Sequence, residues 1–176
     1  KALIINPNGE IVQKYNKKNI PSEKCYQEKY YFNQPKNSFK FFDIGKFRIG
    51  ILICWDQWYA RSYEYMRKNN VNLIICPTAI GFCKIKNKNI SIRGEREKWL
   101  NVITANSLMI NTPVVICNRI GTESDKDHSI SFWGSSFITD SSGTVVKKCL
   151  TDQRIIHHKI VIKDQITAKS MWNFID

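Results

Sequence analysis

A chain of 176 residues with 43% hydrophobic residues can bury one sizeable core, which excludes a largely disordered polypeptide. Its apolar runs are far shorter than the roughly 20 residues that a membrane-spanning helix requires, so we expect no membrane association. The formal net charge of +12 would suit a nucleic-acid partner, but the lysines are scattered along the whole length, so we expect a solvated basic surface and no nucleic acid.

The six cysteines include no C-x-x-C pair and no histidine at metal-ligand spacing, which argues against zinc. Cys54, Cys76 and Cys117 each end an apolar run, where a reduced thiol packs as a small hydrophobic side chain. We therefore expect free thiols rather than a disulfide framework, and a reducing, cytoplasmic compartment.

The first part of the chain predicts two hairpins separated by a loop. Residues 2–15 have apolar runs on either side of Pro-Asn-Gly, which is typical of a turn between antiparallel strands. Residues 16–37 are polar with embedded aromatic side chains and predict a loop. Residues 38–54 predict two further strands about a turn at residues 43–46.

The middle of the chain alternates helical and strand patterns. Residues 57–70 lack glycine and proline and suit a helix, whereas residues 71–77 predict a short buried strand. A lysine-rich stretch at residues 84–89 predicts an exposed loop. Residues 91–110 predict a second helix, and residues 112–118 predict another buried strand. The apolar positions of the second helix are Trp99, Val102, Ile103, Leu108 and Ile110.

The last part of the chain predicts a third hairpin, about Asp-Ser-Ser-Gly in residues 132–149. Residues 157–162 predict a final strand, and residues 164–174 the start of a helix. Two strand–helix–strand units flanked by hairpins together predict an α/β layered domain.

The stretch GILICWDQW, residues 50–58, ends an apolar strand at Cys54 and turns abruptly aromatic and acidic. A cysteine in this place is most often a packing residue. A turn from strand to helix also places a side chain at the carboxyl end of a sheet, where backbone N–H groups favour a thiolate and a developing oxyanion. We expect His128 in a loop, and His157 and His158 are neighbours near the end of the sequence. No local pattern supports a dyad of Cys54 with any of these histidines, so the residues alone leave both interpretations open.

Six segments follow one another as they do in a known family. They are YNKKNIP (15–21), YQEKYYFN (26–33), IGILICWDQWY (49–59), CPTAIG (76–81), CNRIG (117–121) and FWGSSFI (132–138). On these segments the chain resembles the nitrilase superfamily of carbon–nitrogen hydrolases, and within it the N-carbamoylputrescine amidases. The resemblance implies a four-layer αββα sandwich of the nitrilase type. Residues 1–176 would then form a single domain, incomplete at the N-terminus and also at the C-terminus.

The resemblance also implies a catalytic set. By motif position, Cys54 matches the nucleophile, Lys17 the lysine and Glu28 the second glutamate, and the backbone N–H of Trp55 would help to bind an oxyanion. The family's first catalytic glutamate belongs to an N-terminal part that has no counterpart here, and Glu10 matches no motif. This chemistry requires no metal and no organic cofactor.

Two segments near these residues differ from the family. Asn19 stands where the family has histidine in its Lys-x-His motif. After WDQWY the family reads Pro-Glu-Ala-Ala-Arg, whereas residues 60–64 are ARSYE, so that Arg61 and Glu64 exchange the two charges. Three positions apart on a helix, these two could pair with each other.

The implied function is that of a thiol amidohydrolase that cleaves the carbamoyl C–N bond of N-carbamoylputrescine, a small-molecule substrate, to putrescine, carbon dioxide and ammonia. A β-ureidopropionase, an ω-amidase and a non-catalytic degenerate member stay open. The family also implies a homo-oligomer.

The aromatic side chains of residues 30–32 and Trp58 could line a substrate pocket or pack elsewhere. Asn118 and Arg119 follow a strand near the expected pocket.

Overall fold

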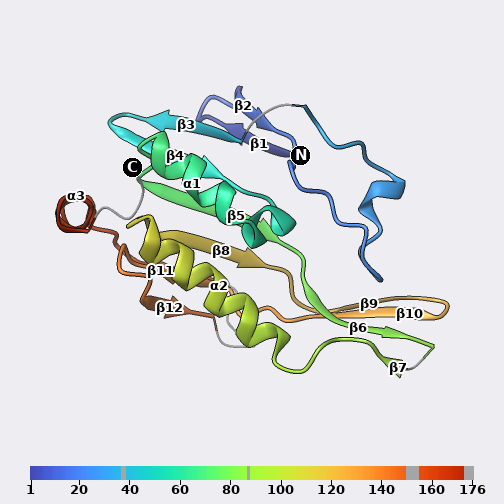
Figure 1. The fold of residues 1–176 in the computed structure, drawn as a ribbon. Helices are drawn as coiled ribbons and strands as arrows, with labels where there is room; N and C mark the ends of the chain where they lie inside the picture. Colours follow the sequence, from blue (N-terminus) through green and yellow to red (C-terminus); the bar gives the residue numbers. More distant parts are fainter. Residues whose placement is uncertain (37–38, 87, 150–154, 173–176) are drawn as a thin grey trace.

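A six-stranded sheet forms the centre of the computed structural model, which describes residues 1–36, 39–86, 88–149 and 155–172 (Figure 1). Its strand order is β12-β11-β8-β5-β4-β3. The strands are β3 Lys40–Ile44, β4 Phe47–Ile51, β5 Leu73–Thr78, β8 Val114–Asn118, β11 Phe137–Thr139 and β12 Val145–Lys148. The middle strands β4, β5 and β8 run parallel, and hairpins add the antiparallel neighbours at both sides. The parallel strands therefore all end at the same edge of the sheet.

Two helices, α1 (Ala60–Lys68) and α2 (Glu95–Met109), lie side by side against one face of this sheet (Figure 1). Helix α1 buries Tyr63 and Met66 completely, and α2 buries Trp99 and Ile103. The Trp99 ring lies 5.5 Å from that of Phe137 in β11. Burial of these large apolar side chains fixes the helical layer on the sheet.

Two smaller sheets extend the structure beyond the central one. The hairpin β1 (Ala2–Ile5) and β2 (Ile11–Tyr15) forms a separate two-stranded sheet. The other has the strand order β7-β6-β10-β9. Its strands are β6 Gly81–Ile85, β7 Lys88–Asn89, β9 Thr122–Asp125 and β10 His128–Phe132.

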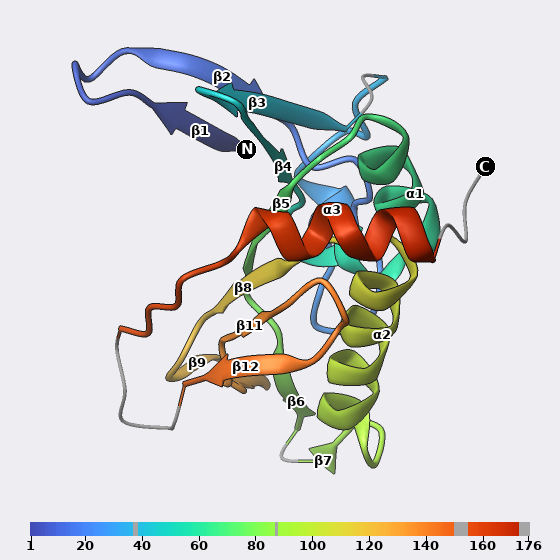
Figure 2. The same ribbon diagram turned by 90° about the vertical axis from the view of Figure 1, so that its left-hand side faces the viewer.

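Helix α3 (Ile162–Met171) packs at the edge where the parallel strands begin (Figure 2). The buried Gln165 amide donates to the carbonyl of Val71 at 3.3 Å and to the Thr112 hydroxyl at 3.2 Å, just before β5 and β8. Lys169 Nζ donates to the same Val71 carbonyl at 3.2 Å, and burial lowers the pKa of this lysine to about 8. Helix α3 therefore does not cover the opposite edge of the sheet, at which the parallel strands end.

The structure confirms the predicted hairpins in residues 2–15, 38–54 and 132–149, and both strand–helix–strand units. The first predicted helix begins later than expected, at Ala60, because Cys54–Trp58 forms a separate 3₁₀ helix, η2. The periodicity of residues 57–70 did not distinguish the two helix types.

Two predictions about strands were wrong. Residues 157–161 contain no regular strand, and α3 begins at the next residue. His128, which we expected in a loop, lies in β10, and the sequence analysis missed the hairpin that β10 forms with β9. Strand β9 is polar and exposed throughout, so it lacks the alternating apolar residues from which a strand is predicted.

Lys84, Lys86 and Lys88 in the lysine-rich stretch are exposed as expected, but the stretch is not simply a loop. The chain pairs Lys84 with Asn89 and Ile85 with Lys88 as β6 and β7. The partner strands supply backbone hydrogen bonds that the local composition does not reveal.

The cysteine expectations need two corrections. Cys25 and Cys83 form a disulfide with their Cα atoms 6.4 Å apart, although they stand 58 positions apart in sequence. Cys54, Cys76, Cys117 and Cys149 form no disulfide, but Cys117 is exposed. The apolar run before Cys117 predicts a buried strand, and the alternation of faces along β8 turns this one side chain outward.

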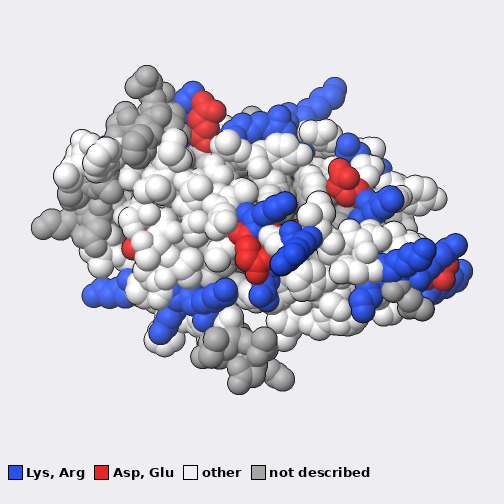
Figure 3. Space-filling model, turned by 60° about the horizontal axis from the view of Figure 1, so that its bottom comes forward, with Lys and Arg blue, Asp and Glu red and all other residues white. Residues whose placement is uncertain are grey.

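Lys and Arg side chains on the face shown in Figure 3 lie in several separate groups, some with Asp or Glu beside them. Among the described residues, no helix is both long enough and apolar enough to cross a membrane.

Helix α2 provides a test of which face holds the core. Ile103 is completely buried, whereas Leu108, which we also expected to be an apolar contact of this helix, is 46% exposed. Ile103→Ala should lower the free energy of unfolding by about 2–5 kcal/mol, because it leaves a cavity against the sheet. Leu108→Ala should change it by less than about 1 kcal/mol. Urea unfolding of both variants measures the difference, and equal losses would contradict this packing.

Candidate active site

Cys54 lies just beyond the carboxyl end of β4, where the chain leaves the central sheet. Its φ angle is +46°, a conformation that costs free energy for a residue with a side chain. The next turn is closed in both directions: Asp56 N donates to the Ile53 carbonyl at 3.0 Å, and Ile53 N donates to Asp56 Oδ2 at 3.0 Å. The fold therefore holds Cys54 at a strained turn at the edge of a parallel sheet, where ligands commonly bind in open α/β sheets.

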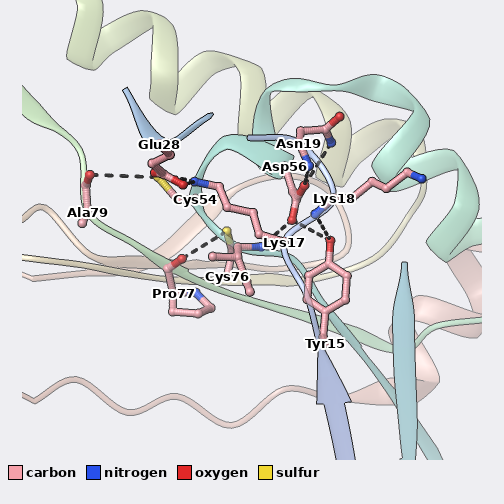
Figure 4. A network of polar contacts seen from close by, with 11 residues as sticks. Tyr15, Lys17, Lys18, Asn19, Glu28, Cys54, Asp56, Cys76, Pro77 and Ala79 are labelled. Atoms are coloured by element: carbon pink, nitrogen blue, oxygen red, sulfur yellow. Dashed lines mark hydrogen bonds and ion pairs between the residues drawn. The ribbon is translucent and has the colours of Figure 1, made fainter. Parts of the chain in front are cut away.

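Lys17 and Glu28 form a close ion pair beside this turn (Figure 4). Lys17 Nζ donates to Glu28 Oε1 at 2.7 Å and to Oε2 at 2.6 Å. The Lys17 side chain is only 10% exposed and that of Glu28 is 32% exposed. The structure thus brings together three of the predicted site residues, Lys17, Glu28 and Cys54, from segments far apart in the sequence.

The loop that carries Glu28 is anchored next to this residue. Glu28 begins a short 3₁₀ helix, η1 (Glu28–Tyr30). Two positions earlier, the Tyr26 hydroxyl donates to the Gly81 carbonyl at 3.0 Å and accepts from Gly81 N at 3.0 Å. Burial raises the pKa of Tyr26 to about 12, so this hydroxyl stays protonated and can make both bonds. Tyr26 and the Cys25–Cys83 disulfide both tie the loop to β6.

Burial dominates the electrostatics of the thiol. It raises the pKa of Cys54, the Lys17 ammonium opposes this rise, and the Glu28 and Asp56 carboxylates add to it. The sulfur lies 4.0 Å from the carbonyl oxygen of Ala79, beyond the end of β5. Sequence reasoning expected the local turn and the following helix to favour the thiolate. In the structure, Lys17 is the largest influence that lowers the pKa of Cys54, and the contact with the Ala79 carbonyl is a smaller one. Helix α1 begins only at Ala60.

A cavity of about 710 Å³ opens over these residues. Lys17, Glu28 and Cys54 line it together with Tyr31 and Phe32, two of the aromatic side chains singled out in the sequence. Trp55, the proposed oxyanion residue, directs its ring elsewhere, with its centroid 6.2 Å from that of Trp58 and 6.5 Å from that of Tyr26. The cavity therefore combines a thiol, an ion pair and an aromatic rim.

Asn118 and Arg119 do not act in this cavity. The buried Asn118 amide donates to the carbonyls of Ile80 and Gly134 and accepts from Ile80 N, which fastens two loops together. Arg119 pairs with the Glu123 carboxylate at 2.6 Å.

Two of the departures from the family meet in space. Arg61 donates to Asn19 Oδ1 at 2.6 Å, and Glu64 pairs with Lys68 at 2.7 Å rather than with Arg61. The Asn19 amide in turn donates to Asp56 Oδ1 at 3.0 Å. Sequence reasoning missed Asp56, although this carboxyl group follows directly after Cys54 and Trp55 in a stretch otherwise rich in apolar residues.

The described residues contain no group of three or more His, Cys, Asp or Glu side chains placed to hold a metal ion. His157 and His158 are exposed. The ionisable groups that act on Cys54 are therefore carboxylates and an amine rather than imidazoles.

This arrangement of a cysteine at the end of a parallel strand, facing a Lys–Glu pair, corresponds to a known class of protein. The model of the family described as carbon-nitrogen hydrolase matches residues 1–168. The chain therefore belongs to the carbon–nitrogen hydrolases of the nitrilase superfamily.

Within this family, the chain is similar to two relatives and to one solved structure. The chain is 36% identical to N-carbamoylputrescine amidase of Oryza sativa over 150 residues, which is 83% of this chain and 48% of that protein. It is 34% identical to citrullinase of Francisella tularensis over 140 residues, which is 80% of this chain and 48% of that protein. A carbon-nitrogen hydrolase from Helicobacter pylori G27 superposes with a TM-score of 0.88 at 26% identity, over 98% of this chain and 60% of that one. The predicted nitrilase-type α/β fold is confirmed, and the chain spans about half the length of these two relatives.

The Lys17 ammonium should control the ionisation of Cys54. In Lys17→Met, the thiolate loses its nearest cation and Glu28 loses its partner, and both changes disfavour the thiolate. We expect the midpoint of the pH profile for alkylation of Cys54 by iodoacetamide to move to higher pH. Mass spectrometry of the Cys54 peptide separates this thiol from the other free cysteines.

Lys18→Met is the matched control for this measurement. Lys18 Nζ lies 3.4 Å from the Pro35 carbonyl and is not among the groups that shift the pKa of Cys54. Its profile should match that of the unmodified protein. A profile of Lys17→Met that also stays unchanged would show that Lys17 does not stabilise the thiolate.

Proposed function

We propose that this chain carries the nucleophile, lysine and second glutamate of a thiol amidohydrolase that acts on a terminal carbamoyl group, with N-carbamoylputrescine as the leading substrate. The observation that carries the proposal is that Lys17, Glu28 and Cys54 line one cavity, with the ion pair beside the thiol. Family membership supports the same type of chemistry.

In the first half of the reaction, the Cys54 thiolate attacks the carbamoyl carbon. The C–S bond forms as the carbonyl becomes a tetrahedral oxyanion, which the Lys17 ammonium and the backbone N–H of Trp55 would stabilise. Collapse of this intermediate breaks the bond to the terminal nitrogen, which leaves as ammonia after it takes up a proton. The product is a thiocarbamate on Cys54.

In the second half, water attacks this thiocarbamate and releases the free thiol. The resulting carbamic acid breaks down to the amine and carbon dioxide. In the family, a glutamate from the N-terminal part donates the proton in the first half and activates water in the second. In the present chain, Glu28 would hold Lys17 at the oxyanion and share in proton transfer, since it accepts two hydrogen bonds from the ammonium.

The choice of substrate rests on the relatives. The names of the rice and Francisella proteins point to N-carbamoylputrescine and to citrulline, which both end in a ureido group on an aliphatic chain. The exposed aromatic side chains of Tyr31 and Phe32 at the cavity could pack against such a chain. Citrulline is therefore the second candidate substrate. β-Ureidopropionate and ω-amides rank below both.

Other features expected of the whole protein belong to the same proposal. They are one carbon–nitrogen hydrolase domain over residues 1–176, homo-oligomerisation, a cytoplasmic location and a role in polyamine biosynthesis. The competing proposal is a non-catalytic member that keeps the fold. The replacement of the family's histidine by Asn19 motivates it.

Cys54→Ala should abolish ammonia release from N-carbamoylputrescine, because no other group of the site can form the covalent intermediate. Lys17→Ala should raise the activation free energy by about 2.7–4 kcal/mol, the usual effect of removing an oxyanion donor. The assay measures ammonia at near-neutral pH with the protein expressed from its natural start. Turnover retained in Cys54→Ala would rule out this mechanism.

The substrate assignment is tested with citrulline, β-ureidopropionate and an ω-amide in the same assay. We expect the largest kcat/KM for N-carbamoylputrescine. A larger value for citrulline would replace the substrate but keep the mechanism. Absence of turnover with all four, by protein that is folded by circular dichroism, would favour the non-catalytic alternative.

A further inference from the structure

The Asp56 carboxylate is the most heavily bonded side chain near the site, and no direct cation neutralises it among the described contacts. It is completely buried. Asp56 Oδ2 accepts from the Tyr15 hydroxyl at 2.6 Å and from Ile53 N at 3.0 Å. Asp56 Oδ1 accepts from Asn19 N at 2.7 Å and from Asn19 Nδ2 at 3.0 Å. Four donors of this kind satisfy the hydrogen-bonding capacity of a buried carboxyl group and fix its position.

Three of these bonds, from Tyr15 and Asn19, join the segment that carries Lys17 to the segment that carries Cys54 (Figure 4), and the fourth, from Ile53 N, closes the turn at Cys54. Ile53 immediately precedes Cys54. Tyr15 and Asn19 stand two positions before and two positions after Lys17, and Lys18 N donates to the Tyr15 hydroxyl at 3.2 Å. Since β2 ends at Tyr15, no strand or helix holds the backbone of Lys17. The contacts to Asp56 on both sides of Lys17 replace that support.

Arg61 contacts Asn19 from the surface of the protein. Asn19 Nδ2 donates to Asp56 while Asn19 Oδ1 accepts from Arg61 at 2.6 Å, so both ends of the amide are used and its orientation is determined. The guanidinium also lies over the Tyr59 ring, 4.8 Å from its centroid. The amide thus links a buried anion to a cation at the surface.

We propose that Asp56, Asn19 and Arg61 form a positioning unit that holds Lys17 against Cys54, and that Asn19 and Arg61 are a matched pair, in which the residue at one position determines which residues suit the other. This inference rests on the proposed function, since it assigns the unit to that reaction. None of the three residues lines the cavity, so they act through Lys17 and Cys54 rather than on substrate.

Hydrogen-bond chemistry links the residues at positions 19 and 61. The side chain at position 19 has to donate a hydrogen bond to Asp56 and also form a hydrogen bond with residue 61. Asparagine does both when residue 61 is a donor, as arginine is here. A protonated histidine donates from both ring nitrogens, so it would suit Asp56 together with a glutamate at position 61. Asn19 beside a glutamate, or a histidinium beside Arg61, would leave one contact repulsive, whereas a neutral imidazole beside Arg61 could donate to Asp56 and accept from the guanidinium.

The first test uses Asn19→Leu, which removes both amide contacts without a change of charge. The charged groups that act on Cys54 are Lys17, Glu28 and Asp56. If Lys17 moves away, the midpoint of the pH profile for alkylation of Cys54 shifts to higher pH, and alkylation at neutral pH slows by about tenfold, which is within the usual coupling between groups in contact. An unchanged profile would overturn the positioning role.

Cys76 reports whether a variant remains folded in the same experiment. This thiol is completely buried, so its alkylation indicates that the structure has opened. If Asn19→Leu opens the fold, Arg61→Glu provides the same test, because Arg61 is exposed in the first turn of α1, where a glutamate is compatible with the helix. Glu64→Gln, on the same helix and paired only with Lys68 among the described contacts, is the matched control and should leave the profile unchanged.

The second test is the exchange of both residues. Arg61→Glu should shift the profile, Asn19→His should shift it where the new imidazole is protonated, and the double variant Asn19→His/Arg61→Glu should return towards the unmodified protein. The double variant restores the hydrogen bonds but not the original net charge, so its recovery reports positioning rather than a long-range field. A double variant no better than the worse single one would overturn the matched pair.

Turnover gives an independent result. In the proposed reaction, Asn19→Leu should lower kcat by about tenfold and leave KM nearly unchanged, since the unit does not touch the substrate. If the unmodified protein hydrolyses none of the candidate substrates, the proposed function fails. The alkylation profiles still decide the positioning role, because they require no substrate.

Discussion

The buried Asp56 carboxylate is the constraint on which the site depends. An anion without exposure to water is tolerated only where donors surround it, and here the donors come from β2, from the segment after β2 and from the turn at Cys54. Satisfying this one group therefore fixes the relative position of two chain segments. The strained backbone of Cys54 is held by the same bonds, since Asp56 closes the turn that begins at Ile53.

The opposing effects on the Cys54 thiol give this constraint its chemical importance. Burial raises the pKa of the thiol, and Lys17 is the cation that opposes the rise. Lys17 is itself shared with Glu28, so its influence depends on distances within the site rather than on the presence of a positive charge alone. A chain with a net charge of +12 gains little at Cys54 from lysines exposed elsewhere on the surface.

The replacements at positions 19 and 61 show how a sequence comparison can mislead when residues are considered singly. Asn19 and the exchanged charges of Arg61 and Glu64 each looked like the loss of a contact. In the structure, Arg61 and Asn19 bind each other, and Glu64 binds a lysine one turn along its own helix. These departures, together with the family's first glutamate, which has no counterpart in this sequence, had suggested a non-catalytic protein. In the structure they are consistent with a site that keeps its shape through different partners.

The sequence by itself determined most of the local elements and the α/β class, because hydrophobic periodicity and turn residues are properties of neighbouring positions. The three candidate residues Lys17, Glu28 and Cys54 came from the resemblance of short motifs to a known family. Only the tertiary structure decided which distant residues meet: Asp56 with Asn19, Asn19 with Arg61, and Cys25 with Cys83. It also decided that Cys117 faces outward and that the polar β9 is a strand. The physical reason is that burial, pKa shifts and strand pairing depend on atoms from other parts of the chain, which no local pattern specifies.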